Sequence, residues 1–370
     1  MPGVTFTLLF GFAPAPPEVV DAVQEIEIEA ATDAASVCRL RLGIAQTKLG
    51  DWSVLEKDFF RPMVPLSVRL TPGIGIPEAV FNGYVTHLDA AYPIEPGGAT
   101  LEVTALDLTH LMNLEEKVTA WPNMPDGAIA AAIFGLYGAI PLVQPTAPQL
   151  VEPEGTTTQR DTDIRFLKKL AMRNGFDCYV QPEPISGLDQ AYFQPPPSPV
   201  GPPQAVVNVG MGPENNVEGF RVSYEMTRPT AAVAAVVDAA TKAVQPALAP
   251  VSARTPMGIE PSLLRVVPPP MARPADTGAL SIGELQPLVQ SIVDESSWAL
   301  VAEGSVGLDA GILRPGKLIN VRGAGRLFSG SYLATRISHS VRREGSYTQT
   351  FQARRNAVGM TGAELYVALP

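Results

Sequence analysis

Proline and glycine set the strongest limit on what this chain can fold into. The 370 residues include 37 Pro and 32 Gly, which together approach a fifth of the chain. Because proline lacks a backbone N–H and glycine weakens helices, this density favours many strands joined by turns over long helices. The chain is therefore predicted to be β-rich, and at about 100–200 residues per domain its length predicts two or three domains.

The charge balance argues against a protein that coats nucleic acid. Asp and Glu number 37 against 27 Lys and Arg, a formal charge of -10. Binding to phosphates needs clustered positive charge, so direct nucleic-acid binding is not expected. The two cysteines, Cys38 and Cys178, lie far apart and match no metal or disulfide spacing, which predicts two buried free thiols.

The start of the chain does not have the sequence pattern of an export signal. Met1–Phe12 has no basic region, and its apolar run breaks at Pro14, Pro16 and Pro17. No stretch reaches the ~18 uncharged apolar residues that a membrane span requires. We therefore expect the chain to be made and folded in a bacterial cytoplasm.

Short strands are predicted over the first 115 residues or so. In residues 25–30 three glutamates alternate with Ile26 and Ile28, which is the period of a half-exposed strand. Similar patterns continue to residue 105 between proline–glycine turns, and together they predict a small barrel or sandwich. The expected strands are 25–30, 38–44, 64–70, 79–88 and 99–105.

Helical spacing replaces this alternation between residues 107 and 180. Apolar residues at 108–114 predict one helix, and Asp126 is placed to cap a second helix that runs to Tyr137. The clearest helix is 163–173, with Asp161 or Thr162 as its N-cap and Asn174-Gly175 as its left-handed stop. A strand is expected at 176–181.

The rest of the chain mixes proline-rich stretches with further elements. Residues 182–203 and 246–274 are dense in proline and predict exposed connections. An alanine-rich helix is predicted at 231–243 and another helix at 286–301. Strands are predicted at 206–209, 217–224, 317–322, 332–342 and 347–354. The architecture inferred is α+β and β-rich, with a β domain at each end and α/β material between them.

Catalytic and cofactor motifs are missing. His87, His110 and His339 form no metal-binding pair, so no metal site is predicted. Residues 311–317 fit the first seven positions of a phosphate-binding loop, but Leu318 replaces the required Ser or Thr and the flanks predict a turn entering a strand. The carboxylate pairs Glu115/Glu116 and Glu152/Glu154 are adjacent or flanked by proline, which is typical of solvated surface rather than a glycosidase pair. No catalytic, cofactor-binding or metal residue is predicted.

Arginines cluster near the end of the chain. They are Arg336, Arg342, Arg343, Arg354 and Arg355. In an acidic chain this asymmetry fits the polar lining of a channel or a contact with an acidic neighbouring subunit. An ordinary charged face of a strand explains it equally well.

Residues Thr158–Phe176, followed by Tyr179-Val180, resemble a segment of the phage late control D family. That family comprises baseplate hub proteins and the hub part of VgrG spikes in type VI secretion. Thr162 stands where Ser is usual, and Phe176 where Tyr is usual. Residues 104–180 and 311–356 are similar to the family throughout, and the resemblance extends more weakly over most of 1–358.

The resemblance implies two tube-like β-barrel domains and a pseudo-hexameric trimer. The expected domains are 1–105, an inserted α/β domain at 106–205, and a second tube-like domain at 206–360 with a helical and proline-rich insertion at 229–305. The implied role is a structural baseplate hub of a contractile phage tail or phage-tail-like injection system. Its homotrimer would join the six-fold tail tube to a three-fold spike. Nothing after Asn356 resembles a fused spike, so the spike is expected to be a separate protein.

Two other functions fit the sequence less well. A tail-associated hydrolase that degrades peptidoglycan needs a convergent acid or nucleophile set, which the motifs do not supply. A carbohydrate-binding adhesin should be rich in exposed aromatic residues, and only Trp52, Trp121 and Trp298 are present as tryptophans. The sequence leaves open whether the particle is a phage, a bacteriocin-like particle or an injection system.

Overall fold

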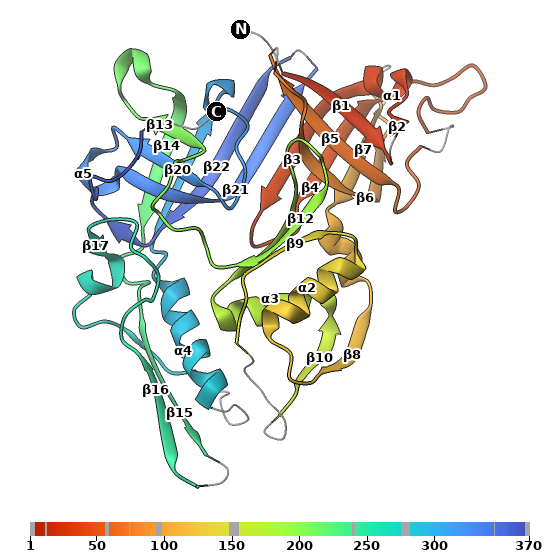
Figure 1. Ribbon diagram of the computed structural model, residues 1–370. Helices are drawn as coiled ribbons and strands as arrows, with labels where there is room; N and C mark the ends of the chain where they lie inside the picture. The colour runs from red at the N-terminus through yellow and green to blue at the C-terminus, as the bar shows by residue number, and fades with distance from the viewer. Residues whose placement is uncertain are drawn as a thin grey trace.

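The computed structural model describes residues 4–11, 13–55, 59–73, 75–93, 98–147, 155–238, 241–274, 282–343 and 345–366. Strands dominate its regular structure, and the helices are few (Figure 1). The predicted β-rich class is confirmed as a mostly β fold with large antiparallel sheets and a few helices.

One large sheet runs through both ends of the chain. Its order is β14-β19-β22-β21-β3-β4-β7-β6-β5-β1-β2, with β20 and β13 attached beside β21. The early strands are β1 (Val4–Phe10), β2 (Ala13–Pro14), β3 (Val23–Ala31), β4 (Val37–Gly43), β5 (Pro65–Pro72), β6 (Glu78–Ala91) and β7 (Thr100–Leu106). The late strands are β13 (Ala205–Asn208), β14 (Val217–Tyr224), β19 (Leu300–Val306), β20 (Leu318–Arg322), β21 (Gly330–Arg342) and β22 (Tyr347–Arg355).

The five strands predicted for the first part of the chain are present as β3 to β7, with ends shifted by one to three residues. In β3, Ile26 and Ile28 are buried while Glu27 is exposed, as the alternation predicts. β1 was not predicted, because its apolar run lacks strict alternation. It pairs with β5 along its whole length.

The two ends of the sheet repeat one arrangement of strands. The order β5-β6-β7-β4-β3 in the first part matches β20-β21-β22-β19-β14 in the second, and the chain visits the strands in the same succession in both. Two register irregularities of the first unit also have counterparts in the second, whereas the one at Val68/Arg69 has none. The matching irregularities lie at Val23/Glu25 and Val217/Gly219, and at Val85/His87 and Ala334/Arg336. The chain therefore contains two β units of one topology, joined side by side where β3 pairs with β21.

Each β unit has its own apolar core. Leu40, Leu66, Phe81 and Val103 are among the side chains buried in the first unit. Residues of β13, β19, β20, β21 and β22 fill the second core, in which Tyr332 is fully buried. Short elements connect or follow the strands of the two units: α1 (Pro17–Ala22), η2 (Gly212–Glu214), η4 (Leu308–Ala310), α5 (Gly325–Phe328) and β23 (Ala357–Val358).

A compact α/β unit lies between the two β units in sequence and below the large sheet in Figure 1. Its apolar residues form a separate core, to which Phe134, Leu167 and Phe193 contribute. Its elements are η1 (Leu108–Asn113), β8 (Glu116–Trp121), α2 (Asp126–Leu136), β9 (Ile140–Val143), β10 (Thr157–Thr162), α3 (Asp163–Asn174), β11 (Asp177–Pro182) and β12 (Asp189–Gln194).

The predicted helices of this unit are present, but their caps differ. α3 ends at Gly175 with φ 64°, as predicted. Thr162 occupies the N-cap position, yet its hydroxyl donates to Asn113 Oδ1 rather than capping the helix. Asp126 is the first residue of α2 and pairs with Arg173 instead of capping. The helix predicted at 108–114 is a 3-10 helix, and β8, β9, β10 and β12 were not predicted. The stretch 182–203 is therefore not simply an exposed connection: β12 lies within it, pairs with β11 and buries Phe193 in the core of the unit.

The insertion after β14 corrects two helix predictions. Residues 231–243 begin with strand β15 (Ala231–Val237), paired to β16 (Val244–Ala249), because valines fit the half-buried sheet under α4. Helix α4 (Ile282–Ser296) starts and ends earlier than predicted, and β19 follows it. The proline-rich stretch 246–274 is not simply a connection, since it contains part of β16 and also β17 (Glu260–Pro261), η3 (Ser262–Arg265) and β18 (Met271–Ala272).

Candidate functional site

A polar surface extends over one face of eight neighbouring strands, β14-β19-β22-β21-β3-β4-β7-β6. The opposite face of the same strands covers the two apolar cores. Cross-strand register assigns to the polar face Arg221 and Ser223; Glu303 and Ser305; Thr348, Thr350 and Gln352; Arg336, Ser338, Ser340 and Arg342; Glu25, Glu27 and Glu29; Arg39 and Arg41; Glu102 and Thr104; and His87 and Asp89. We call this surface the polar sheet face.

Opposite charges nearly cancel on the polar sheet face. At the joint between the two β units, Arg336 lies 3.1 Å from Glu29 and Arg342 lies 3.0 Å from Glu25. The whole face carries five arginines, Arg39, Arg41, Arg221, Arg336 and Arg342, against six carboxylates, Glu25, Glu27, Glu29, Asp89, Glu102 and Glu303. Such a mixed surface stays wet and offers no single-sign field to a ligand.

This face is hollowed over the second β unit. A depression of about 500 Å³ is lined by polar side chains of β14, β19, β21 and β22, including Arg221, Glu303 and Arg336. It is open, and no cluster of convergent acids or nucleophiles lines it. Its shape and chemistry suit contact with a polar surface rather than capture of a small molecule.

The arginines predicted as one basic cluster divide among four environments. Arg336 and Arg342 belong to the polar sheet face and pair with carboxylates of the same chain. Arg354 lies 4.5 Å from the ring centre of Trp298 and ion pairs with Asp177 and Glu295, so it ties the second β unit to the α/β unit and to α4. Arg343 is exposed and Arg355 is buried. The sequence does not predict this division, because the contacts of each arginine are made by residues far away in the chain.

Arg355 is a fully buried guanidinium held by backbone carbonyls. Its nitrogens donate four hydrogen bonds, at 2.7–3.0 Å, to the carbonyl oxygens of Met257, Ser329 and Gly359. No carboxylate of the described residues lies within ion-pair distance of it, and burial lowers the pKa of Arg355. Because these three carbonyls belong to distant segments, Arg355 joins the insertion, the turn before β21 and the end of the chain.

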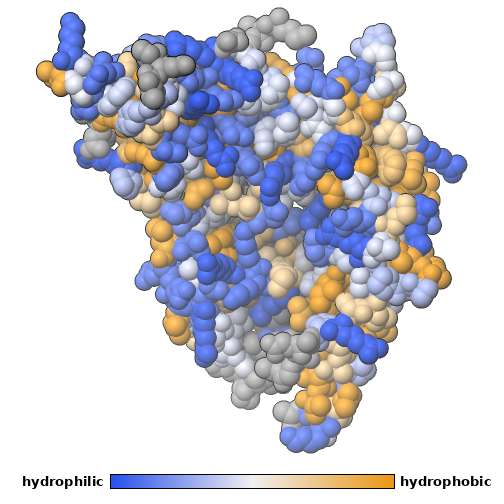
Figure 2. Space-filling model, turned by 180° about the vertical axis from the view of Figure 1, so that it is seen from behind, coloured by the Kyte–Doolittle hydropathy of each residue, from blue (hydrophilic) through white to orange (hydrophobic). Residues whose placement is uncertain are grey.

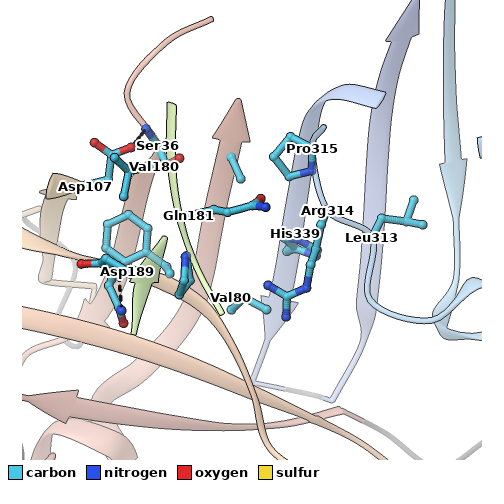
Figure 3. A pocket seen from close by; sticks show the side chains of 14 residues that line it. Ser36, Val80, Asp107, Val180, Gln181, Asp189, Leu313, Arg314, Pro315 and His339 are labelled. Atoms are coloured by element: carbon cyan, nitrogen blue, oxygen red, sulfur yellow. Dashed lines mark hydrogen bonds between the residues drawn. The ribbon is translucent and has the colours of Figure 1, made fainter. Parts of the chain in front are cut away.

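A buried polar junction lies where the two β units and the α/β unit meet (Figure 3). Asp107 accepts from the backbone N–H of Ser36 at 2.6 Å and of Thr109 at 3.0 Å, and burial raises the pKa of this carboxyl. Asp189 accepts from Asn82 at 2.9 Å. The cavity among these groups has a volume of about 10 Å³, which is room for one water at most. The junction is thus a structural joint without space for a substrate.

A chain of polar groups continues from this junction into the second β unit. His339 Nδ1 lies 2.8 Å from the hydroxyl of Tyr347, which donates to Gln349. Gln349 in turn donates to the carbonyls of Gly307 and Gly311, and it accepts from the N–H of Leu313. Burial lowers the pKa of His339 to about 3, so the imidazole is neutral at pH 7. The buried network fixes the loop before β20.

The same loop accounts for the motif that resembles a phosphate-binding loop. Residues 311–317 lead into β20 and open no helix, as predicted. Arg314 pairs with Glu78 at 3.0 Å, and its backbone N–H and carbonyl bond to the side chain of Gln204. This loop borders an open groove of about 1130 Å³, whose lining carboxylates are Glu78 and Asp309. Since Glu78 is already neutralised by Arg314, the groove lacks a free acid pair.

The remaining residues singled out in the sequence do not converge. His87 is exposed on β6, His110 lies in η1, and Glu116 begins β8; Glu152 and Glu154 lie outside the described residues. Across the described ranges no group of three or more His, Cys, Asp or Glu is placed to hold a metal. Both cysteines are buried free thiols, as predicted, and burial raises the pKa of Cys178 to about 12. None of the described helices is long and apolar enough to cross a membrane.

A second surface feature is the hairpin of β15 and β16, which projects away from the rest of the molecule. One side of it packs on α4. The other side carries Val233, Val237, Val244 and Leu248 in cross-strand pairs, and three of these four side chains are exposed. Figure 2 shows apolar residues gathered on this projection.

No protein-family model and no curated protein matches the sequence. Solved structures do match the whole fold. A tail protein from Neisseria meningitidis has a TM-score of 0.63 at 12% identity, with 100% of both chains covered. A 43 kDa tail protein of a Shewanella oneidensis prophage has a TM-score of 0.63 at 14% identity, with 96% and 99% covered. An Escherichia coli component of the type VI secretion system, described as similar to bacteriophage T4 tail proteins, has a TM-score of 0.56 at 13% identity, with 94% and 76% covered. The chain therefore has the fold of these tail and secretion-system proteins.

Proposed function

We propose that this chain is the structural baseplate hub of a contractile phage tail or of a phage-tail-like injection system. It acts as a homotrimer that joins the six-fold tail tube to a three-fold central spike. The resemblance of Thr158–Phe176 to hub proteins and the shared fold with tail proteins support this role. Its partners are a ring of the tail tube, the spike and other baseplate components.

The internal repeat is the observation that carries the proposal. One chain holds two β units with the same strand order and two bulges at equivalent places. Three chains would then present six similar units, which is the geometry needed to match a six-fold ring on one side and a three-fold spike on the other. We assign residues 1–105 and 206–360 to these two tube-like domains, with the α/β domain at 106–205 and the insertion at 229–305.

A hub of this kind needs no reacting group, because it works through interface area and symmetry. The polar sheet face would line the inside of the ring, where a hydrated, charge-balanced wall lets other components pass without holding them. The chain would assemble in the bacterial cytoplasm and end in the baseplate of the particle.

Light scattering coupled to size exclusion tests the assembly. A mass near three times 39.2 kDa is expected, and negative-stain images of that species should show a ring with six similar lobes. A monomer would contradict the trimeric hub. Digestion of purified peptidoglycan tests the alternative of a cell-wall hydrolase, and release of soluble fragments by the protein would favour that alternative instead.

A further inference from the structure

Two strand edges of the polar sheet face have no partner in the described chain. β14 pairs with β19 on one side, and no described strand pairs with its other side. The last part of β6, His87–Ala91, pairs with β7 on one side, whereas β5 follows β6 only as far as Tyr84. An unpaired edge is a template for adding a strand from another chain. β14 and the end of β6 lie toward opposite sides of the large sheet (Figure 1).

The internal repeat shows which strand fits each edge. In the repeat, β14 corresponds to β3, and β6 corresponds to β21. The structure already pairs β3 with β21 inside one chain, from Arg336 opposite Ala31 to Arg342 opposite Glu25. The free edge of β14 is therefore equivalent to the edge of β3 that pairs with β21. By the same equivalence, the strand that matches β14 is the end of β6 in a second copy of the chain.

The bulges fix the register of this contact. Alignment of Val217/Gly219 with Val23/Glu25 makes Gly219 equivalent to Glu25, and hence Ser223 to Glu29. The bulges at Val85/His87 and Ala334/Arg336 likewise make Asp89 equivalent to Ser338. Ser338 lies opposite Glu29. Asp89 of one copy is thus expected opposite Ser223 of the next, with Leu88 opposite Tyr224 and Ala90 opposite Val222.

We propose that copies of this chain join head to tail by antiparallel pairing of β14 in one copy with residues 87–91 of β6 in the next, in this register. The proposal rests on the trimeric hub proposed above and names its subunit contact. The pairing of β3 with β21 already joins the two β units of one chain in this way. Repeating the equivalent pairing between chains closes three copies into one continuous sheet.

Side-chain chemistry agrees on both faces of the proposed contact. On the core side, Leu88 is 39% and Tyr92 51% exposed in the single chain, and the register sets them against Tyr224 and Phe220. On the polar side, neither Asp89 nor Arg221 has an ion-pair partner among the described residues.

The register also brings these two charges together. Arg221 lies two residues before Ser223, so it is diagonal to Asp89 across the contact. Arg336 reaches Glu29 along the same diagonal, since it lies opposite Ala31. A diagonal neighbour on one face of a sheet is within reach of a long side chain.

A pair of cysteines tests the contact and its register together. The full-length double variant Asp89→Cys/Ser223→Cys is oxidised and run on a non-reducing gel, with Asp89→Cys/Val222→Cys as the matched control. A slip of one residue moves a side chain to the other face of the sheet, so the control should not cross-link. The native Cys38 and Cys178 are buried and give little background. We expect the band of the test variant to shift from one chain to two and three chains.

Two measurements on the same proteins separate this inference from the proposed function. A trimeric mass for the unmodified protein with no cross-link in Asp89→Cys/Ser223→Cys, or with equal cross-linking in the control, overturns the contact and leaves the trimeric hub standing. A monomeric mass overturns both. The charge pair gives an independent check, because Asp89→Arg should lower the trimer fraction and Asp89→Arg/Arg221→Asp should restore it.

Discussion

Replacement of Arg355 by leucine should destabilise the second β unit although no charged partner is lost. The side chain is 0% exposed, and its donors satisfy two buried carbonyls, those of Met257 and Ser329, and the partly buried carbonyl of Gly359, which also accepts from the N–H of Ile259. A buried carbonyl without a donor costs about 1–3 kcal/mol, so the two buried carbonyls cost about 2–6 kcal/mol. The variant no longer buries a guanidinium, which offsets several kcal/mol. We expect a net loss of about 2 kcal/mol, or a melting temperature ~4–8 °C lower.

The assay combines thermal unfolding with hydrogen exchange read by mass spectrometry. Arg355→Leu should speed exchange in the peptides that contain Met257, Ser329 and Gly359, while the α/β unit is unaffected. Arg343→Leu is the matched control, because Arg343 is exposed and should change stability by less than about 0.5 kcal/mol. Equal melting temperatures for the two variants would refute the view that Arg355 holds these segments together.

Three further changes follow from buried groups. Gly330→Ala should lower the free energy of unfolding in urea by about 1–3 kcal/mol, because Gly330 has φ 130° and an added Cβ would lie 2.5 Å from the Arg355 guanidinium. Gly307→Ala is the control: it places its Cβ in open space and should be nearly neutral. Burial holds the pKa of His339 at about 3, below its unfolded value. The folded state therefore keeps its full stability above pH ~6.5 and loses stability as the pH falls toward 3, because the unfolded chain binds the proton first. The free energy of unfolding of the unmodified protein should be ~3 kcal/mol lower at pH 4.5 than at pH 7 because of this group, and His339→Gln should not show this loss. An equal loss in the unmodified protein and in His339→Gln would contradict the assignment. Asp126→Asn leaves the Arg173 guanidinium with the more distant carboxylate of Glu284, at 3.8 Å. Calorimetry should record a loss of about 1–3 kcal/mol, partly regained in Asp126→Leu/Arg173→Met.

Local patterns in the sequence predicted most single elements. Alternation of buried and wet residues located β3 to β7, and helical spacing with Gly175 located α3 and its end. These signals are local because a strand or a helix turn is set by side chains two to four residues apart. The local pattern at residues 231–237 failed, since alanine and valine are compatible with either state and only the pairing with β16 and the packing on α4 decided for a strand.

The candidate surface could be predicted only in fragments. The glutamates of β3 and the arginines of β21 each indicated a wet face, but they lie some 300 residues apart, and nothing local says that they pair. The sequence by itself supplies no catalytic motif. It does not show the 10 Å³ volume of the buried junction or the burial of Arg355, which depend on the tertiary structure.

The sequence by itself determined the β-rich class, the places of most strands and the helix stop at Gly175, because these depend on neighbouring residues. Only the tertiary structure revealed the internal repeat. Its strands share their order and two bulges but not residues: Glu25, Glu27 and Glu29 occupy the positions of Gly219, Arg221 and Ser223. A sheet constrains which face is buried and how strands pair, and many side chains satisfy both conditions, so the repeat persists in the backbone after it has vanished from the sequence.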